Sequence, residues 1–396
     1  MSKILIVSQH YYPENFRVTD IAETLFKNGN EVTVVCGYPN YPEGNIYEGY
    51  YGKGKKEHKE EVLNGVKVLR CYEHPRKKSF IHLFFNYYSV SLSMKRRVKK
   101  IKEKFDCVLI NQLSPVMQAW GGIAYAKKHK VPCFLYCYDL WPDSLAAGGI
   151  KKGSLIYNYY QKVSNKIYKK VDKIMVTSKN FINYFKQQHG IEESKLMYLP
   201  QYCEDVYYSP TKREGKKNIN YVFAGNVGKM QSVETIIRAA NIIKNDKEIK
   251  IHIVGSGSNL DSCKKMAKDL NLDNVVFHGQ HSVEEMPKFY EMATAMLVTL
   301  GKNDVISYTL PGKVQSYMCA GKPIIASIDG ETQMIMKEAN CGMYCDSEDY
   351  EGLAEIMLEF KAININEMGN NARKYYEEHF RKGKFFENLS NIMEVK

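Results

Sequence analysis

Two short segments place glycine and lysine where a strand is expected to end and a helix to begin. AGNVGKMQS at 224–232 sets Gly225 and Gly228 before Lys229, and PGKVQS at 311–316 sets Gly312 before Lys313. Glycine lets the backbone approach a ligand closely, the amide groups at a helix start attract anions, and lysine adds a formal charge. A diphosphate group would satisfy all three features together.

A third segment, IVGSGSN at 253–259, carries Gly255 and Gly257 in a similar pattern. Leu260 occupies the position of the third glycine in the GxGxxG fingerprint, so a dinucleotide-binding motif is not supported. Any one of these loops is open to a second interpretation, an ordinary strand-to-helix turn with a solvated lysine. Three such loops at one domain edge favour the anion site.

These loops need sheets to position them, and the alternation of apolar runs with helical segments predicts two doubly wound parallel sheets. Several runs are apolar nearly throughout, as strands buried on both faces must be. The strands expected first are 3–8, 31–36, 66–71, 106–111, 132–137 and 172–177, with helices at 17–28, 115–129 and 154–170. After a polar linker near 200–219 come strands at 220–225, 249–254, 274–279, 295–300 and 322–327, with helices at 232–244, 258–270 and 313–320.

The predicted fold class is therefore α/β, with two facing Rossmann-like domains. Its length of 396 residues suits two domains that each bury a core. We expect the domains to cover 1–200 and 201–377, and the aromatic-rich carboxyl-terminal segment 378–396 to cross back and pack on the first. Ligands of this architecture bind beyond the carboxyl ends of the strands.

The basic excess lies entirely in the first half of the chain. The formal net charge is +12, of which residues 1–200, with 32 basic and 17 acidic side chains, contribute +15. Such a balance indicates a polyanionic partner, either a nucleic acid or an anionic membrane surface. No nucleic-acid recognition motif is evident, so we expect no nucleic-acid partner.

The segment 76–100 gathers basic residues at both ends of an aromatic-rich helical stretch. Its apolar part, about 15 residues, is shorter than the roughly 20 that span a bilayer. It could lie in the interface of an anionic membrane, with the side chains of Phe80, Leu83, Phe84, Tyr87 and Tyr88 facing the lipid. Alternatively, it could be an ordinary buried helix with a solvated basic end.

The cysteines and the amino-terminal residues indicate the expected cellular compartment of the protein. Most of the ten cysteines lie in apolar runs without CxxC or zinc-ligand spacing, and we interpret them as reduced core thiols. No signal peptide is evident at the start of the sequence. The expected location is cytoplasmic, peripheral on the inner face of the cell membrane.

The sequence resembles the retaining nucleotide-sugar glycosyltransferases of family 4, which have the two-Rossmann architecture called GT-B. The resemblance rests on GNVGKMQ at 225–231, the glycines of 255–257 and PGKVQSYMCAGKP at 311–323, and it covers nearly the whole chain. YYPENFR at 11–17, YDLWPDS at 138–144 and SIDGET at 327–332 look like the branch that adds N-acetylated amino sugars in capsule and O-antigen assembly. The implied acceptor is a saccharide carried on a polyprenyl diphosphate.

The resemblance implies roles for particular residues. Lys229 and Lys313 would neutralise charge on the departing diphosphate, because displacing it leaves oxocarbenium character on the sugar and extra negative charge on phosphate. The expected donor-binding residues are Glu14, Asn15, Arg17, Gly225, Asn226, Gly228, Gln231, Gly255, Gly257, Gly279, Gln280, Pro311, Gly312, Ser316 and Glu331. No DxD pair appears at a strand end, so we expect neither a metal nor another cofactor beyond the UDP-sugar substrate.

The sequence departs from the family pattern at two places. Ser316 and Tyr308 stand where many members have two glutamates, the second of which binds the donor ribose. Tyr138 and Asp139 stand where many members have a histidine of the catalytic region, so Asp139 is the catalytic candidate there.

Other polar residues keep two interpretations each. Asp143 could orient hydroxyl groups or cap a helix, and Glu331 could contact sugar or simply begin a helix. His10 could serve the site or pack at a strand end, and Trp141 is expected in the wall. Two other functions remain open, a UDP-sugar epimerase of the same two-domain shape and, less favoured, a nucleic-acid-binding protein.

Overall fold

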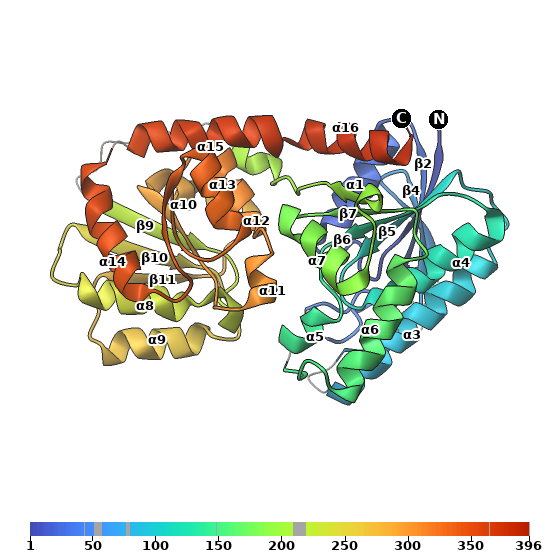
Figure 1. Cartoon of the computed structure of the whole chain (residues 1–396), viewed down its shortest axis with the longest axis horizontal. Coiled ribbons are helices and arrows are strands. Elements are labelled where there is room, and N and C mark those ends of the chain that lie inside the picture. Colours follow the sequence, from blue (N-terminus) through green and yellow to red (C-terminus); the bar gives the residue numbers. More distant parts are fainter. Residues whose placement is uncertain are drawn as a thin grey trace. The chain divides into compact units, whose positions relative to one another are not determined.

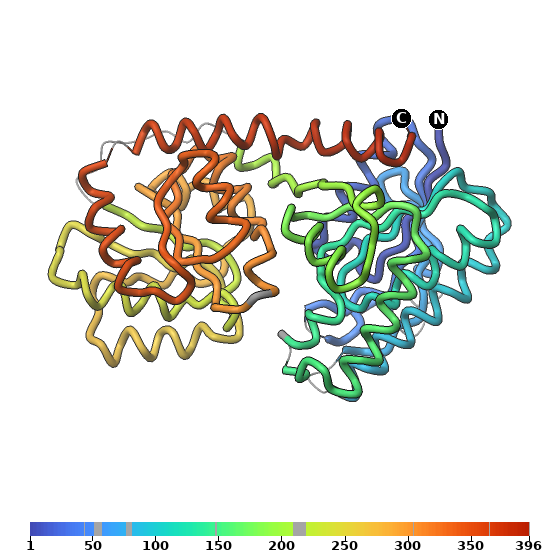
Figure 2. Tube along the Cα trace, viewed as in Figure 1, coloured from blue at the N-terminus to red at the C-terminus, as the bar shows by residue number. Residues whose placement is uncertain are grey.

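A computed structural model describes residues 1–42, 44–50, 58–76, 80–147, 149–208, 219–363 and 365–395 (Figure 1). The chain divides into two units, of which unit 1 comprises Met1–Leu199 with Phe386–Lys396 and unit 2 comprises Pro200–Phe385. Residues 386–396 thus belong to unit 1 although they follow unit 2 in the sequence (Figure 2).

The described part of unit 1 contains an eight-stranded sheet in the order β3-β4-β2-β1-β5-β6-β7-β8, parallel except for β3. The strands are β1 Lys3–Val7, β2 Glu31–Gly37, β3 Glu60–Leu63, β4 Val66–Cys71, β5 Cys107–Gln112, β6 Cys133–Cys137, β7 Lys173–Val176 and β8 Leu196–Tyr198. The helices are α1 Arg17–Lys27, α3 Phe80–Lys99, α4 Ala119–His129, α5 Asp143–Ala147, α6 Leu155–Tyr168 and α7 Lys179–His189.

Local sequence explains these elements. Ile4, Leu5 and Ile6 in the central strand β1 are completely buried, because helices cover both faces of a doubly wound sheet. Helix α1 buries Val18, Ile21, Ala22 and Leu25, which recur with helical spacing on one face.

The described part of unit 2 contains a six-stranded sheet in the order β11-β10-β9-β12-β13-β14, and all its strand pairs are parallel. The strands are β9 Ile219–Ala224, β10 Ile249–Val254, β11 Val275–Gly279, β12 Ala295–Thr299, β13 Ile324–Ser327 and β14 Gly342–Cys345. The helices are α8 Val233–Ile242, α9 Leu260–Asp269, α10 Met286–Met292, α11 Asp304–Ser307, α12 Gly312–Cys319, α13 Glu331–Ala339, α14 Tyr350–Glu359 and α15 Ile365–His379. Helix α16, Lys382–Met393, contains the boundary between the units.

The predicted α/β class with two parallel sheets is confirmed. Each strand expected from the sequence is present within about two residues, and β3, β8 and β14 are additional. All ten cysteines are free and nine are buried, as expected for core thiols.

Candidate functional site

The glycine loops of unit 2 follow neighbouring strands. Strand β9 lies between β10 and β12 and is parallel to both, so the loops at 225–232 and 255–259 leave the same edge of the sheet. Parallel strands that end together gather their following loops at one place, where α/β proteins bind ligands.

Tyr317 fixes the position of helix α12 at this edge. Its hydroxyl group accepts a hydrogen bond of 3.0 Å from the Ala224 amide and donates one of 3.0 Å to the Ala224 carbonyl. The side chain is fully buried. The start of α12 is therefore held against the loop that follows β9, by a contact that no local sequence pattern indicates.

Lys313 lies in the first turn of α12 and reaches back to this loop. Its ammonium group donates a hydrogen bond of 3.0 Å to Oε1 of Gln231 and lies 3.9 Å from the ring centroid of Phe223. A Cβ atom on Gly225 would lie 3.2 Å from the same nitrogen. Burial lowers the pKa of Lys313 to about 7, because the charged form loses hydration there. An anion at this position would restore the charged form.

Gly255 serves the contact between two loops. Its φ is +140°, and a Cβ atom there would lie 1.9 Å from the carbonyl oxygen of Gly225. The amide of Val227 also donates to the carbonyl of Ser256 at 2.8 Å. The second glycine loop therefore supports the first, a structural role that the sequence pattern did not separate from ligand binding.

The other predicted residues of unit 2 lie around these loops. Asn226 and Lys229 are exposed, and Ser256 donates a hydrogen bond of 2.9 Å to Gln280. Ser316 is buried on α12, and its hydroxyl donates to the Gly312 carbonyl at 3.4 Å. Glu331 is also buried and begins α13, next to the amino-terminal cap Gly330. Gly228 and Gly257 lie in the two glycine loops, Gly279 is the last residue of β11, and Pro311 is the amino-terminal cap of α12.

Unit 1 contains a pocket of about 390 Å³ beyond the ends of β1, β5 and β6. Its wall includes the predicted residues His10, Asp139 and Trp141 together with Arg76 and Ser114. Ser114 was not singled out in the sequence, because an isolated serine carries no spacing signal.

His10 is held by Glu14 at the rim of β1. Nδ1 of His10 lies 2.9 Å from Oε2 of Glu14, and both side chains are buried. The other oxygen of Glu14 accepts backbone amides of Asn40 at 2.8 Å and Tyr41 at 2.7 Å. The ring of His10 also stacks on Phe16 at 4.4 Å. Both carboxylate oxygens of Glu14 thus contact groups of unit 1, and the side chain holds the histidine in position.

Asp139 is held by Ser114. One carboxylate oxygen accepts from the Ser114 amide at 2.9 Å and from its hydroxyl at 2.8 Å, and Trp141 donates to that hydroxyl at 2.8 Å. Burial raises the pKa of Asp139 despite these donors. The carboxyl group is fixed in the pocket wall, where it can orient a polar ligand.

Asp143 is engaged inside unit 1. Its carboxylate accepts hydrogen bonds from Tyr157 at 3.1 Å and from Tyr184, and it pairs with Lys152 at 2.8 Å. Asn15 is exposed and Arg17 begins α1, and neither lines the pocket of about 390 Å³.

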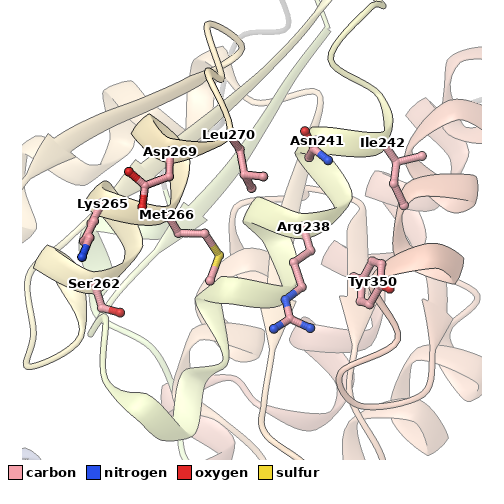
Figure 3. Close-up of a pocket in the computed structure, with 9 residues that line it drawn as sticks. All are labelled: Arg238, Asn241, Ile242, Ser262, Lys265, Met266, Asp269, Leu270 and Tyr350. Carbon is pink, nitrogen blue, oxygen red and sulfur yellow. The ribbon is translucent and has the colours of Figure 1, made fainter.

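A second pocket lies in unit 2, beside helices α8 and α9. Its volume is about 600 Å³, and its lining comes from α8, α9 and Tyr350 of α14 (Figure 3). Arg238 lies over the ring of Tyr350 at 5.5 Å. None of the predicted site residues lines this pocket.

The described residues contain no cluster of three or more His, Cys, Asp or Glu side chains suited to hold a metal ion. None of their helices combines the length and apolarity required to cross a bilayer.

Comparisons with known proteins agree with this geometry. Residues 15–201 match the family model Glycosyltransferase Family 4, and residues 209–379 match Glycosyl transferases group 1. The probable glycosyltransferase WbjE of Pseudomonas aeruginosa is 26% identical over 62% of this chain and 64% of its own. The putative colanic acid biosynthesis glycosyl transferase WcaI of Escherichia coli is 23% identical over 89% of this chain and 87% of its own.

A solved structure shows the same fold. The crystal structure of Anabaena Alr3699/HepE in complex with UDP superimposes with a TM-score of 0.72 at 12% identity, covering 100% of both chains. Residues 15–201 thus match a glycosyltransferase domain of the first kind and residues 209–379 match one of the second, and the fold is the two-domain fold called GT-B. Both matched families describe transferases, so the alternative of an epimerase is not favoured.

Proposed function

We propose that this glycosyltransferase moves a sugar, of the N-acetylated amino sugar class, from a UDP-sugar to a polyprenyl-diphosphate-linked saccharide with retention of configuration. The step would belong to the assembly of a cell-surface polysaccharide such as capsule or O-antigen. WcaI, named for colanic acid biosynthesis, supports this setting, and HepE, solved with UDP, supports the nucleotide.

The observation that carries the proposal is the position of Lys313. Its ammonium group lies beside Gly225 and Gln231, at the start of a helix, and the amino-terminal end of a helix attracts an anion. Charge develops on the leaving diphosphate as the glycosidic bond breaks, and a positioned cation stabilises that charge. Lys229, exposed on the loop beyond Gly228, adds a second cation at the same edge.

The pocket in unit 1 supplies groups suited to hydroxyl recognition. Asp139 and His10 both line it, and each is fixed by a buried partner, Ser114 and Glu14 respectively. In the proposed reaction Asp139 orients a hydroxyl group of the acceptor or the sugar, while Trp141 forms the wall.

Membrane attachment through residues 76–100 completes the proposal, although 77–79 lie outside the described residues. Ile81, Phe84 and Phe85 on α3 are 65%, 44% and 53% exposed. Tyr87, expected to face lipid, is instead buried against Trp141, with ring centroids 6.0 Å apart. The apolar side chains that remain exposed suit the interface of an anionic membrane on the inner face of the cell membrane.

The experiment is a transfer assay with a panel of UDP-sugars and a polyprenyl-diphosphate-linked saccharide. Mass spectrometry identifies the added sugar, and the anomeric proton coupling in the product reports the configuration. Excess EDTA should leave the rate unchanged, because the lysines replace a metal. An inverted product contradicts the retaining mechanism, and loss of turnover with EDTA contradicts the metal-independent one.

A further inference from the structure

A second concave surface of unit 1 lies between helices α3, α4 and α6, away from the residues assigned to transfer. It has a volume of about 760 Å³, and we call it the basic groove. Helix α4 packs against both α3 and α6, so all three helices meet there (Figure 1). Six lysines line it: Lys95, Lys127, Lys128, Lys162, Lys166 and Lys170.

The groove combines these cations with an apolar floor. Trp120, Ile123 and Val163 line it, and no acidic residue is among its described lining. The ammonium group of Lys95 lies 5.9 Å from the ring centroid of Trp120. Lysine stems cover apolar surface while their charged ends remain hydrated, so the groove offers charge at its rim and apolar contact below.

Exposed apolar side chains continue from the groove along α6. Tyr159 lines the groove and is 51% exposed, and Leu155 and Ile156 are 89% and 46% exposed. The hydroxyl groups of Tyr159 and Tyr88 lie 3.1 Å apart, which connects α6 with the exposed aromatic face of α3. Large apolar side chains grouped beside lysines mark an interaction surface.

This combination selects among anionic partners. A nucleic-acid backbone would use the lysines but gain nothing from a leucine that is almost fully exposed. An anionic phospholipid uses both, because its phosphate meets lysine while its acyl chains meet the apolar side chains. The charge and the apolar ridge together therefore fit a lipid surface.

We propose that the basic groove binds the phosphate headgroup of an anionic phospholipid, with Trp120, Leu155 and Ile156 reaching the acyl-chain boundary. The proposal deepens the membrane attachment proposed above and rests on it. It assigns a discrete site on α4 and α6 in addition to the helix at 80–99.

Vesicle co-sedimentation tests the charge. The variant Lys127→Glu/Lys162→Glu/Lys166→Glu is compared with Lys27→Glu/Lys59→Glu/Lys264→Glu, which alters three exposed lysines outside the groove and changes net charge equally. Vesicles contain phosphatidylcholine with about 30% phosphatidylglycerol. We expect at least tenfold weaker binding for the groove variant and a change within about twofold for the control. Equal losses in both variants, or no binding by the unaltered protein, overturn the proposal.

Quenching of tryptophan fluorescence tests how deeply Trp120 enters the lipid bilayer. The chain has two tryptophans, of which Trp141 is fully buried and Trp120 is partly exposed in the groove. Lipids brominated on the acyl chain should quench the emission of Trp120. The Trp120→Phe variant should still sediment but show no such quenching. Quenching that persists in this variant, or its absence in the unaltered protein, contradicts insertion of the groove.

UDP binding separates this proposal from the proposed function. Isothermal titration calorimetry of the groove variant should give the UDP affinity of the unaltered protein, because the proposed donor loops lie in unit 2. Loss of vesicle binding with intact UDP affinity supports the groove alone. Absent UDP binding in the unaltered protein, with vesicle binding retained, counts against the proposed function and leaves the groove supported.

Discussion

The ammonium group of Lys313 and the side-chain oxygen of Gln231 lie 3.0 Å apart, although 82 residues separate them in the chain. One comes from the first turn of α12, and the other from the loop after β9. Because Tyr317 pins α12 to Ala224, the lysine is held in place before any ligand arrives. A cation positioned in advance stabilises a leaving group without reorganisation at the moment of reaction.

Replacing Lys313 with Ala should reduce the transfer rate at least tenfold, corresponding to about 1.4 kcal/mol of transition-state stabilisation. Steady-state kinetics with the UDP-sugar measures the effect. Lys264→Ala on α9 is the matched control, since that lysine is exposed and lies outside the glycine loops. An unchanged rate removes Lys313 from the mechanism.

Binding of UDP should take up a proton at alkaline pH. The free Lys313 has a pKa of about 7, and a neighbouring diphosphate raises the pKa by favouring the charged form. Below pH 7 the lysine is already charged, whereas above pH 7 each pH unit should weaken UDP binding by up to about tenfold. Calorimetry in buffers of different ionisation enthalpy measures the proton uptake, and Lys313→Met should abolish it. Proton uptake that survives in this variant assigns the effect to another group.

Alanine substitutions at Gly255 and Gly312 should have different effects, the first on stability and the second on ligand binding. Gly255→Ala introduces a side chain at positive φ against the Gly225 carbonyl, so we expect it to lower the free energy of unfolding by at least about 2 kcal/mol. Gly312→Ala meets no atom within 4 Å and should leave stability within about 1 kcal/mol. It should nevertheless weaken UDP binding about tenfold, because its methyl group would occupy the space proposed for the diphosphate. Denaturant unfolding and calorimetry of both variants measure the two effects, and unchanged UDP affinity in Gly312→Ala places the diphosphate elsewhere.

Glu73 should make stability depend on pH. It is buried beside Gln9 and Asn86, and burial raises its pKa from 4.5 to about 7. Its folded form therefore binds a proton that the unfolded chain releases, and the resulting stabilisation is complete below pH 4.5 and is lost as pH rises through 7. Glu73→Gln should remove this dependence, on the order of 3 kcal/mol between pH 4.5 and 8. Urea unfolding across that range measures it, and parallel pH profiles for the two proteins refute the assignment.

The central strands were predictable because a strand buried on both faces requires an uninterrupted apolar run, such as residues 4–7 of β1. The strands β3 and β14 escaped prediction for physical reasons. Strand β3 pairs through its backbone at a sheet edge with two glutamates in its four residues, and β14 is a four-residue strand beginning with glycine. Edge strands of this kind need no apolar run.

Some residues of the candidate site were also predictable from the sequence, and others were not. Glycine beside lysine signals an anion loop, so Gly312 and Lys313 were visible in the sequence. The contact of Tyr317 with Ala224 and that of Ser114 with Asp139 join residues far apart, and no local spacing indicates them. Gly255 shows the reverse case, because its pattern suggested a ligand while the structure uses it for packing between loops.

The two edges of the eight-stranded sheet bear on how the protein tolerates crowding. One edge ends in β3, where Glu60 projects carboxylate into solvent and pairs with Arg97, and the other ends in the three-residue strand β8. The charge on edge strand β3 and the short length of edge strand β8 discourage strands of neighbouring molecules from adding to the sheet. On the membrane surface proposed above, the protein would meet its own copies often, and these two edges would keep such encounters from growing into aggregates.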